Sequence, residues 1–344
     1  MSMHAYDGAA AQVSMETFRV VAPGLWTTVQ DLGRPGCQRF GVPVGGALDT
    51  FALEAANRLA GNEPGAAALE ITWLGPRLRV LADTLLAVAG ADVPWEINGR
   101  EAPLWQAVAV RKDDEIRFFP PRRGARAYVA VRGGVAVPAV MGSRSTFVRG
   151  GFGGLHGRPL RAGDVISSFR ADGRGAGGAG EARARDGLRL PEELRRFGLP
   201  QPVRVLAGPQ DDLFAPLAME RLLGATFRVS SQADRMGCRL HGPRLPYRTD
   251  VTQFVTDGTA PGSIQVPGDG RPIVLLADRQ TSGGYPKIAT VISADLDFLA
   301  QAWAGDRVTF RSVSLEEAHR IRRERRALLD AVARFTETVS APTN

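Results

Sequence analysis

Cysteine and histidine are scarce in this chain of 344 residues, which has two cysteines and four histidines. Cys37 and Cys238 lie far apart and form neither a CxxC pair nor a metal-type spacing, so the sequence predicts no disulfide framework and no zinc site. The histidines are His4, His156, His241 and His319, and none of them lies in an HExxH motif. The chain also has no GxSxG nucleophile elbow, so a His-based catalytic triad is disfavoured. No DxDxD-type carboxylate cluster appears, so we expect no metal site.

Long apolar runs are also missing. No run approaches the roughly 18 residues that a membrane-spanning helix needs. Residues 1–15 have neither the charged start nor the apolar core of a signal peptide, and Met15 is an alternative start. We therefore expect a cytoplasmic protein that does not contact a membrane.

Lysine is almost absent, because only Lys112 and Lys287 are lysines among 43 basic residues. The net charge of +7 and the pI of about 10.2 raise the question of nucleic-acid binding. The arginines are dispersed, and their densest cluster, at 320–326, is interleaved with glutamates on a predicted helix. The pattern is typical of a solvated helix face, and we expect no nucleic-acid partner.

Glycine and proline are plentiful instead, with 40 and 23 residues, and they indicate many short strands and turns. The sequence predicts a tail at 1–17, one domain at 18–170, a Gly/Ala/Arg-rich linker at 171–187, a second domain of similar style at 188–312, and a closing helix and tail at 313–344.

Strands are predicted in both domains wherever short apolar runs lie between turn signals. In the first domain these are 18–21, 78–80, 85–89, 107–110, 115–119 and 127–131; in the second they are 203–206, 226–229, 262–266, 273–276, 289–292 and 307–310. Helices are predicted at 49–60, 211–223, 295–302 and 314–338, the last of which begins with the capping box Ser314-Leu315-Glu316-Glu317.

One segment stands out as a candidate for chemistry, and it runs from Ala277 to Ala289 with the sequence ADRQTSGGYPKIA. It follows a predicted buried strand and places hydrogen-bonding side chains around a Gly-Gly turn that can approach a ligand closely. Lys287 is a compact charge with an adjustable pKa, which arginine is not. An ordinary hairpin turn with surface charges explains the segment equally well on its own.

Three further polar segments have the same two interpretations. The loop at 27–49 could aim Asp31 and Arg34 at a ligand, or its aspartates could cap a turn and a helix. Residues 141–146 resemble an anion-binding turn or a plain polar turn. In 230–237, Asp234-Arg235 could face a substrate or shape a loop.

Together these segments resemble one family. VQDLGRPG, GVPVGGALD, MGSRST, SQADRMGCRL, PGSIQVP and ADRQTSGGYPKIA occur in the characteristic order of the biotin-dependent carboxyltransferase-like proteins, a group that includes the C subunit of 5-oxoprolinase, KipA-type proteins and proteins once labelled allophanate hydrolase subunit 2. The resemblance covers about 18–310. It implies a mainly β fold with some α, built from two cyclophilin-like β-barrel domains.

The same resemblance implies a component of an ATP-dependent complex that cleaves the lactam 5-oxoproline to glutamate. Its partners would be a KipI-like B subunit and the A subunit of 5-oxoprolinase, and ATP would be used by the complex. Two alternatives stay open: the carboxyltransferase component of a biotin-dependent urea or amide carboxylase, and a KipA-type regulator of a KipI-like kinase inhibitor. Biotin would not be attached to this chain, which has no Met-Lys-Met context.

On motif position, the resemblance assigns catalytic roles to Asp278, Lys287 and Tyr285. It assigns substrate binding to a larger polar set, which comprises Asp31, Arg34, Arg144, Gln232, Asp234, Arg235, Gln265, Gln280, Thr281, Gly283 and Gly284.

Overall fold

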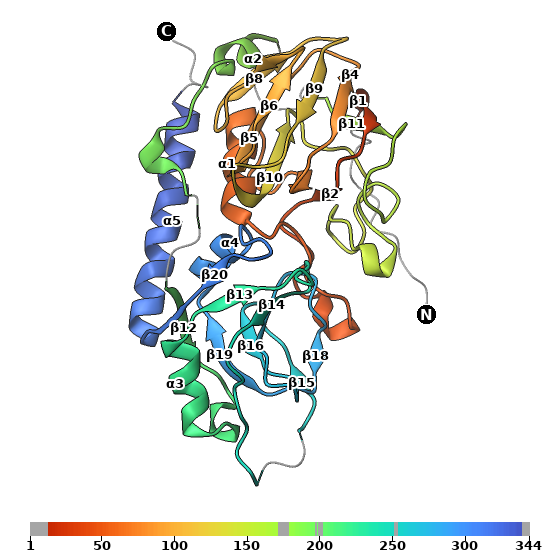
Figure 1. Cartoon of the computed structure of the whole chain (residues 1–344). Helices are drawn as coiled ribbons and strands as arrows, with labels where there is room; N and C mark the ends of the chain where they lie inside the picture. Colours follow the sequence, from red (N-terminus) through yellow and green to blue (C-terminus); the bar gives the residue numbers. More distant parts are fainter. Residues whose placement is uncertain (1–12, 171–178, 197, 199–201, 251–253, 339–344) are drawn as a thin grey trace, which may run out of the picture.

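The chain folds into two β-rich domains, which lie one above the other in Figure 1. The computed structural model describes residues 13–170, 179–196, 198, 202–250 and 254–338. In the N-terminal domain two antiparallel sheets face each other. One has the order β11 (Val165–Phe169), β1 (Ser14–Ala22), β4 (Arg77–Val80), β9 (Glu115–Phe118), β6 (Trp95–Ile97) and β7 (Arg100–Glu101). The other has the order β2 (Trp26–Gln30), β3 (Ala68–Thr72), β10 (Arg123–Val131), β5 (Thr84–Asp92) and β8 (Ala107–Val110).

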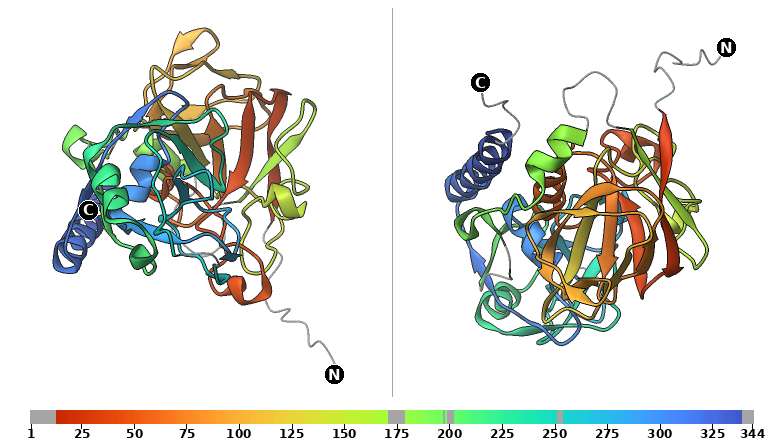
Figure 2. Two further views of the ribbon diagram at one scale, coloured as in Figure 1. Left: turned by 60° about the horizontal axis from the view of Figure 1, so that its bottom comes forward. Right: turned by 90° about the horizontal axis from the view of Figure 1, so that it is seen from above.

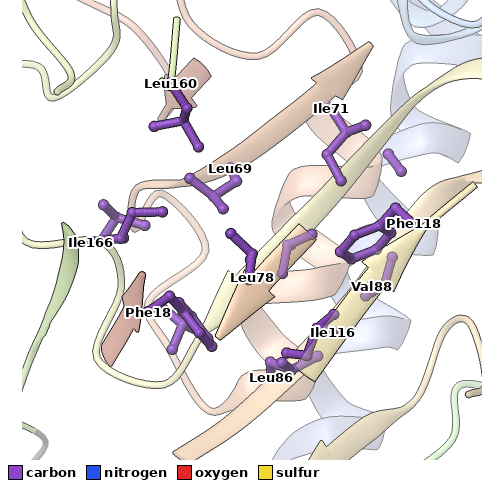
Figure 3. Close-up of a cluster of buried hydrophobic side chains, with 14 of the residues drawn as sticks. Phe18, Leu69, Ile71, Leu78, Leu86, Val88, Ile116, Phe118, Leu160 and Ile166 are labelled. Atoms are coloured by element: carbon purple, nitrogen blue, oxygen red, sulfur yellow. The ribbon is translucent and has the colours of Figure 1, made fainter. Parts of the chain in front are cut away.

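Successive side chains of a strand point to opposite faces of its sheet, so the sheet that contains β10 has one face in the main core and one face outside it. Ala127, Val129 and Val131 of β10 point into the main core between the two sheets. Figure 3 shows this core, to which Phe18, Leu78 and Phe118 of the other sheet also contribute. The alternate residues of β10 therefore point out of the core, towards helix α1 (Thr50–Ala60) and the second domain.

The C-terminal domain is an eight-stranded sheet that closes on itself. Its order is β20 (Arg307–Val308), β13 (Phe227–Val229), β14 (Gly237–His241), β17 (Ile273–Leu275), β16 (Ser263–Gln265), β19 (Lys287–Val291), β12 (Val203–Ala207) and β21 (Phe310–Ser312). Only Thr309 separates β20 from β21, so the first and last strands of the sheet meet and a barrel results. A short ribbon of β15 (Asp257–Gly258) and β18 (Ser282–Gly283) lies beside it. This architecture confirms the predicted mainly β fold with two barrel domains.

The predicted helices are found, with some differences at their ends. α1 and α5 (Leu315–Glu337) match their predictions closely, and Asp49 and Ser314 cap them as expected. The helix predicted at 211–223 is split, because Pro216 starts a new helix, α3 (Pro216–Gly224), after a short 3-10 turn. The helix predicted at 295–302 is shorter, as α4 (Leu296–Leu299).

Two predicted boundaries also shift. β1 begins at Ser14, inside the segment predicted as a tail, because its residues pair with β11. The predicted linker contains α2 (Ala179–Arg185), while its first residues, 171–178, lie outside the described residues. In the part of the chain that the structure describes, five strands of three or more residues were not predicted: β2, β3, β6, β11 and β14.

Helix α5 connects the two domains along the outside of the molecule, as Figures 1 and 2 show. Near its start Ile321 packs with Ile292 of the C-terminal domain, and near its end Leu329 and Val332 pack against the cluster around α1. Between these points Arg325 donates to Asp297 at 2.6 Å. The helix thus holds the two domains in one arrangement.

The cap of α5 gives a first prediction. Ser314 Oγ accepts a hydrogen bond from the backbone N–H of Glu317 at 3.1 Å. Ser314→Ala should lower the free energy of unfolding by about 1 kcal/mol, measured by urea denaturation. Ser314→Asp keeps the acceptor and should stay near wild type; equal losses in both variants would contradict a capping role.

Candidate functional site

A cavity of about 440 Å³ lies between the two domains. Its floor is a row of outward-facing residues, Trp26, Thr72 and Arg126, on the adjacent strands β2, β3 and β10. The pairing registers place these three residues side by side, because Thr72 lies opposite Trp26 on one side and opposite Arg126 on the other. Val148 and Arg149 complete the contribution of the N-terminal domain.

The C-terminal domain covers this floor with two loops and one aromatic side chain: Ala233 to Met236, Asp278 and Trp303. We call this space the Asp278 cavity. Two motifs that are far apart in the sequence meet here, since Asp278 N–H donates to the carbonyl of Arg235 at 2.9 Å. The cavity therefore combines apolar walls with charged groups, as ligand sites commonly do.

Arg235 is the central charge of the site and joins the two domains. Its guanidinium binds Asp278 through two hydrogen bonds of 2.8 and 3.0 Å. It also pairs with Glu70 of β3 and donates to the carbonyl of Gly46 at 2.6 Å, so that four of the five N–H donors of its head group are directed at acceptors. Burial lowers the pKa of Arg235, but Asp278 and Glu70 outweigh that effect and raise it, so the group stays charged.

Glu70 and Tyr128 support Arg235 from the outer face of the N-terminal barrel. The two residues are cross-strand neighbours, and Tyr128 Oη donates to Glu70 Oε2 at 2.7 Å. Burial raises the pKa of Glu70, but Arg235 and Arg126 outweigh it and hold the pKa below its ordinary value. Glu70 is therefore ionised, and its charge is compensated inside the interface.

Arg126 gives the cavity floor a second buried cation. Its Nη1 donates to the carbonyl of Ala300, and its Nε has no partner among the described residues. Burial lowers the pKa of Arg126, with Glu70 acting in the opposite direction. Together with the exposed Arg149, it makes the cavity suitable for a small anion with an apolar portion.

Of the predicted site residues, Asp278, Arg235 and Asp234 meet in this cavity. Asp234 has a local role as well, because its Oδ1 accepts from the backbone N–H groups of Met236 and Gly237 and shapes the loop. Gln232 is exposed next to this loop and does not line the cavity.

The second half of the ADRQTSGGYPKIA segment lies in a different cluster of the C-terminal domain. Lys287 is buried, and its Nζ lies 3.1 Å from Oδ2 of the exposed Asp257. Gln265 accepts from Gln280 at 3.1 Å and donates to the carbonyl of Tyr285 at 3.1 Å. The structure thus separates Lys287 and Tyr285 from Asp278, with which they were predicted to act.

The Gly-Gly turn itself belongs to this second cluster. Gly283 pairs with Asp257 in the ribbon of β15 and β18, and a side chain there would collide with Gln265. Thr281 accepts a backbone hydrogen bond from Thr259 at 3.1 Å, and Gly284 is exposed. These residues shape the turn by their backbones.

Asp31 and Arg144, two predicted site residues of the N-terminal domain, form hydrogen bonds with other residues of the chain. Asp31 accepts from both Ser143 and Ser145 as well as from the N–H of Arg144, which binds the 141–146 turn to the first loop. The Arg144 side chain donates to the carbonyl of Val137 at 3.0 Å. This geometry favours structural roles for Asp31 and Arg144.

Arg34 is buried and lies near Asp278, although it does not line the Asp278 cavity. Its Nη2 donates to the carbonyl of Ser145 at 2.5 Å, while its Nη1 has no partner among the described residues. A Cβ at Gly45 would stand 3.1 Å from Nη1 and 3.7 Å from Asp278 Oδ1, so only a glycine leaves these two groups unobstructed. Burial lowers the pKa of Arg34, while the charges of Asp31 and Asp278 oppose that effect.

The sequence did not point to any of the three floor residues, Trp26, Thr72 and Arg126. It also did not point to the lining residues Arg149 and Trp303, or to Glu70 and Tyr128, which support Arg235. The sequence of β10 did contain a signal for this face of the sheet. Arg126 and Tyr128 occupy alternate positions among the apolar residues of this strand, so both side chains lie on the same face.

Asp49, which contacts Gln301 of the C-terminal domain, gives a prediction of how stability depends on pH. Its Oδ1 caps α1 at Ala52 N–H, and its Oδ2 accepts from Gln301 at 2.7 Å. Burial, followed by the neighbouring charge of Asp297, raises the pKa of Asp49 to about 7. A raised pKa means that folding favours the protonated form, so the contribution of Asp49 to stability is complete below about pH 4 and is lost as the pH rises through about 7.

Asp49→Asn, which stays neutral, should therefore gain stability relative to wild type as the pH is raised from about 4 to about 8. Thermal melts of both proteins across this range measure the change. Asp212→Asn, on the exposed surface, is the matched control and should keep a constant difference from wild type. A constant difference for Asp49→Asn as well would contradict the assigned pKa.

Among the described residues, no group of three or more His, Cys, Asp or Glu side chains could hold a metal ion. Both cysteines are free. Over the same residues, the structure has no helix with the length and apolar character needed to span a membrane.

Comparisons with known proteins agree with this architecture. The chain is 35% identical to the C subunit of 5-oxoprolinase from Escherichia coli (strain K12) over 92% of its own length and 97% of that protein. The crystal structure of Kluyveromyces lactis urea amidolyase matches 92% of this chain and 20% of its own, with a TM-score of 0.84 and 30% identity. The crystal structure of TTHA0988 matches 87% of the chain with a TM-score of 0.75 and 37% identity, and this chain spans just over half, 56%, of that one.

The model of one family, described as carboxyltransferase domain, subdomain A and B, matches residues 40–312. This range includes both loops of the Asp278 cavity and two of its three floor residues, Thr72 and Arg126. The chain therefore belongs to the carboxyltransferase domain family of subdomains A and B.

Proposed function

We propose that this chain is the C subunit of an ATP-dependent 5-oxoprolinase complex, which hydrolyses the lactam of 5-oxoproline to give glutamate. The match to the C subunit of the E. coli 5-oxoprolinase over nearly the whole of both proteins supports the proposal. The observation that carries it is the Asp278 cavity, in which two distant motifs meet as a charged, partly apolar site between the domains.

The groups of the cavity suit the chemistry of 5-oxoproline, which has a carboxylate, a polar lactam and an apolar ring edge. In this proposal Arg149 and Arg126 attract the carboxylate, and Asp278 accepts a hydrogen bond from the lactam N–H. Trp26 and Trp303 cover the ring and exclude water. Arg235 keeps the Asp278 carboxylate in a fixed orientation.

ATP is assigned to the complex as a whole, and it would supply the free energy for opening the lactam. The proposed partners are a KipI-like B subunit and an A subunit. The test is ATP-dependent release of glutamate from 5-oxoproline by the three co-purified subunits, measured with and without this chain. Loss of turnover on omission supports the proposal. A fully assembled complex without turnover contradicts it and favours a KipA-type role, in which the chain only binds the KipI-like protein.

A second candidate is the carboxyltransferase component of a biotin-dependent urea or amide carboxylase. It is favoured by the description of the matched family and by the structural likeness to urea amidolyase. Biotin would be attached to a partner protein and would deliver a carboxyl group to the same cavity. Avidin added to the assembled complex distinguishes the two candidates, because it should abolish biotin-dependent carboxylation and leave lactam hydrolysis unchanged.

A further inference from the structure

The side chain of Gln301 enters the N-terminal domain at a gap in its sheet. Gln301 follows α4, which lies on the side of the C-terminal barrel that faces the N-terminal domain (Figure 1). The pairing of β10 with β5 is irregular between Arg123 and Ala127. In this gap Gln301 Oε1 accepts from the N–H groups of Ala125 and Arg126 at 3.1 and 3.0 Å, and Nε2 donates to the carbonyl of Arg126 at 3.0 Å. An amide of one domain thus takes the place of a strand residue in the other.

The amide of Gln301 is buried, and its hydrogen bonds allow it one orientation. Nε2 also donates to Asp49 Oδ2 at 2.7 Å, so the nitrogen donates two hydrogen bonds and Oε1 accepts two. Turning the amide over would place its NH2 group against two backbone N–H donors and its oxygen against the oxygens of Asp49 and Arg126. The amide therefore holds the backbone of Arg126 in a fixed position.

The residue before Gln301 holds the side chain of the same arginine. The carbonyl of Ala300 accepts a hydrogen bond from Nη1 of Arg126. Two consecutive residues of the C-terminal domain thus bind the backbone and the head group of Arg126, which lies in the floor of the Asp278 cavity. A guanidinium group binds a carboxylate best in a planar, paired geometry, so the direction of the Arg126 head group decides how well it binds one.

From this arrangement we infer that Gln301 is a positioning residue for substrate binding. It acts through Arg126, because it holds the backbone of β10 so that the guanidinium is directed at the carboxylate of the substrate. The inference rests on the proposed function, in which Arg126 attracts the carboxylate of 5-oxoproline. Gln301 and Arg126 belong to different domains, so the Asp278 cavity has its binding geometry only while the two domains are docked.

The first test is a double-mutant cycle of Gln301→Met and Arg126→Met in the assembled complex, with KM and kcat for 5-oxoproline measured separately. Gln301→Met should raise KM at least about tenfold and change kcat less than about threefold, because the contact that is lost is to a carboxylate that does not react. In the Arg126→Met background the same change should raise KM less than about twofold. Equal effects in both backgrounds would overturn the inference, since Gln301 would then not act through Arg126.

An exchange of the two partners gives a rescue test. Gln301→Glu alone places two carboxyl groups against each other, and Asp49→Asn alone places two amides against each other. The combined variant again has one amide and one carboxylate, and the carboxylate at position 301 can still accept from the N–H groups of Ala125 and Arg126. Its KM should return to within about threefold of wild type. A combined variant with a KM no lower than that of Gln301→Glu would contradict the inference.

The matched control is Gln106→Met, the same change at a half-buried glutamine that does not line the cavity, and it should leave KM unchanged. Melting temperatures confirm that each variant is folded. Hydrogen exchange in the purified chain needs no turnover: Gln301→Met should speed exchange of the Ala125 and Arg126 N–H groups at least about tenfold. Unchanged exchange would overturn the inference, whereas a wild-type complex without turnover would be a failure of the proposed function, so the two failures are distinguishable.

Discussion

Arg235→Ala is expected to lower the free energy of unfolding by about 3–5 kcal/mol, the largest stability loss that we predict for a single charged residue. Arg235 is buried and compensates two buried carboxylates, Glu70 of one domain and Asp278 of the other. Removing it leaves both anions in the interface without the guanidinium group that binds them directly. Urea denaturation, or the melting temperature, measures the loss.

Two comparisons make this result specific. Arg248→Ala removes an equally direct ion pair, with Asp250, on the exposed surface and should have no measurable effect. Adding Glu70→Gln to Arg235→Ala should recover part of the loss, because one uncompensated charge disappears. A loss in Arg235→Ala no larger than that in Arg248→Ala would contradict the role of Arg235 as the central charge of the interface.

Asp278→Asn should lower kcat/KM for 5-oxoproline by about 10- to 100-fold in the assembled complex. A hydrogen bond to a charged group contributes about 1.5–3 kcal/mol, and the amide that replaces the carboxylate carries no charge. Asp250→Asn, on the exposed surface, is the control for an equivalent chemical change and should keep full activity. Size-exclusion chromatography of each complex confirms that its components remain associated.

Lys287→Met tests which of two clusters contributes to activity, because the structure places Lys287 and Asp278, both predicted to be catalytic, in different clusters. Lys287 lies with Gln265 and Tyr285, away from the lining of the Asp278 cavity, so we expect a smaller loss of activity than in Asp278→Asn. The reverse order, with Lys287→Met inactive and Asp278→Asn fully active, would move the active site to the Lys287 cluster. The catalytic roles assigned from the sequence stay predictions until this pair is measured.

Local signals in the sequence were sufficient for much of the fold. α1 and α5 were predictable because caps at Asp49 and Ser314 and a stop at Gly61 agree with the apolar spacing between them. Strand β8 was predicted with its observed bounds, because turn residues flank a short apolar run. β2 was missed since its polar threonines are buried by tertiary contacts that no local pattern reveals.

The candidate site was only partly predictable, for a different physical reason. Asp278 and Arg235 were found because each stands in a conspicuous polar loop. Glu70 was missed because it lies in β3, a strand that was not predicted, and because its partner Arg235 is 165 positions away in the sequence. Continuous motifs also mislead here, because one turn divides ADRQTSGGYPKIA between two clusters.

The closure of the C-terminal barrel at Thr309 has a consequence for how the chain is made. The strands of the N-terminal domain are complete at β11, so that domain can fold while the rest is still being synthesised. The C-terminal barrel has to wait, because β13 and β12 gain their outer neighbours only when β20 and β21 have left the ribosome. Until then each of the two strands has one unpaired edge that can bind other chains. A nascent or truncated chain that ends before Phe310 is thus exposed to aggregation, whereas the finished chain has no such edge at this position.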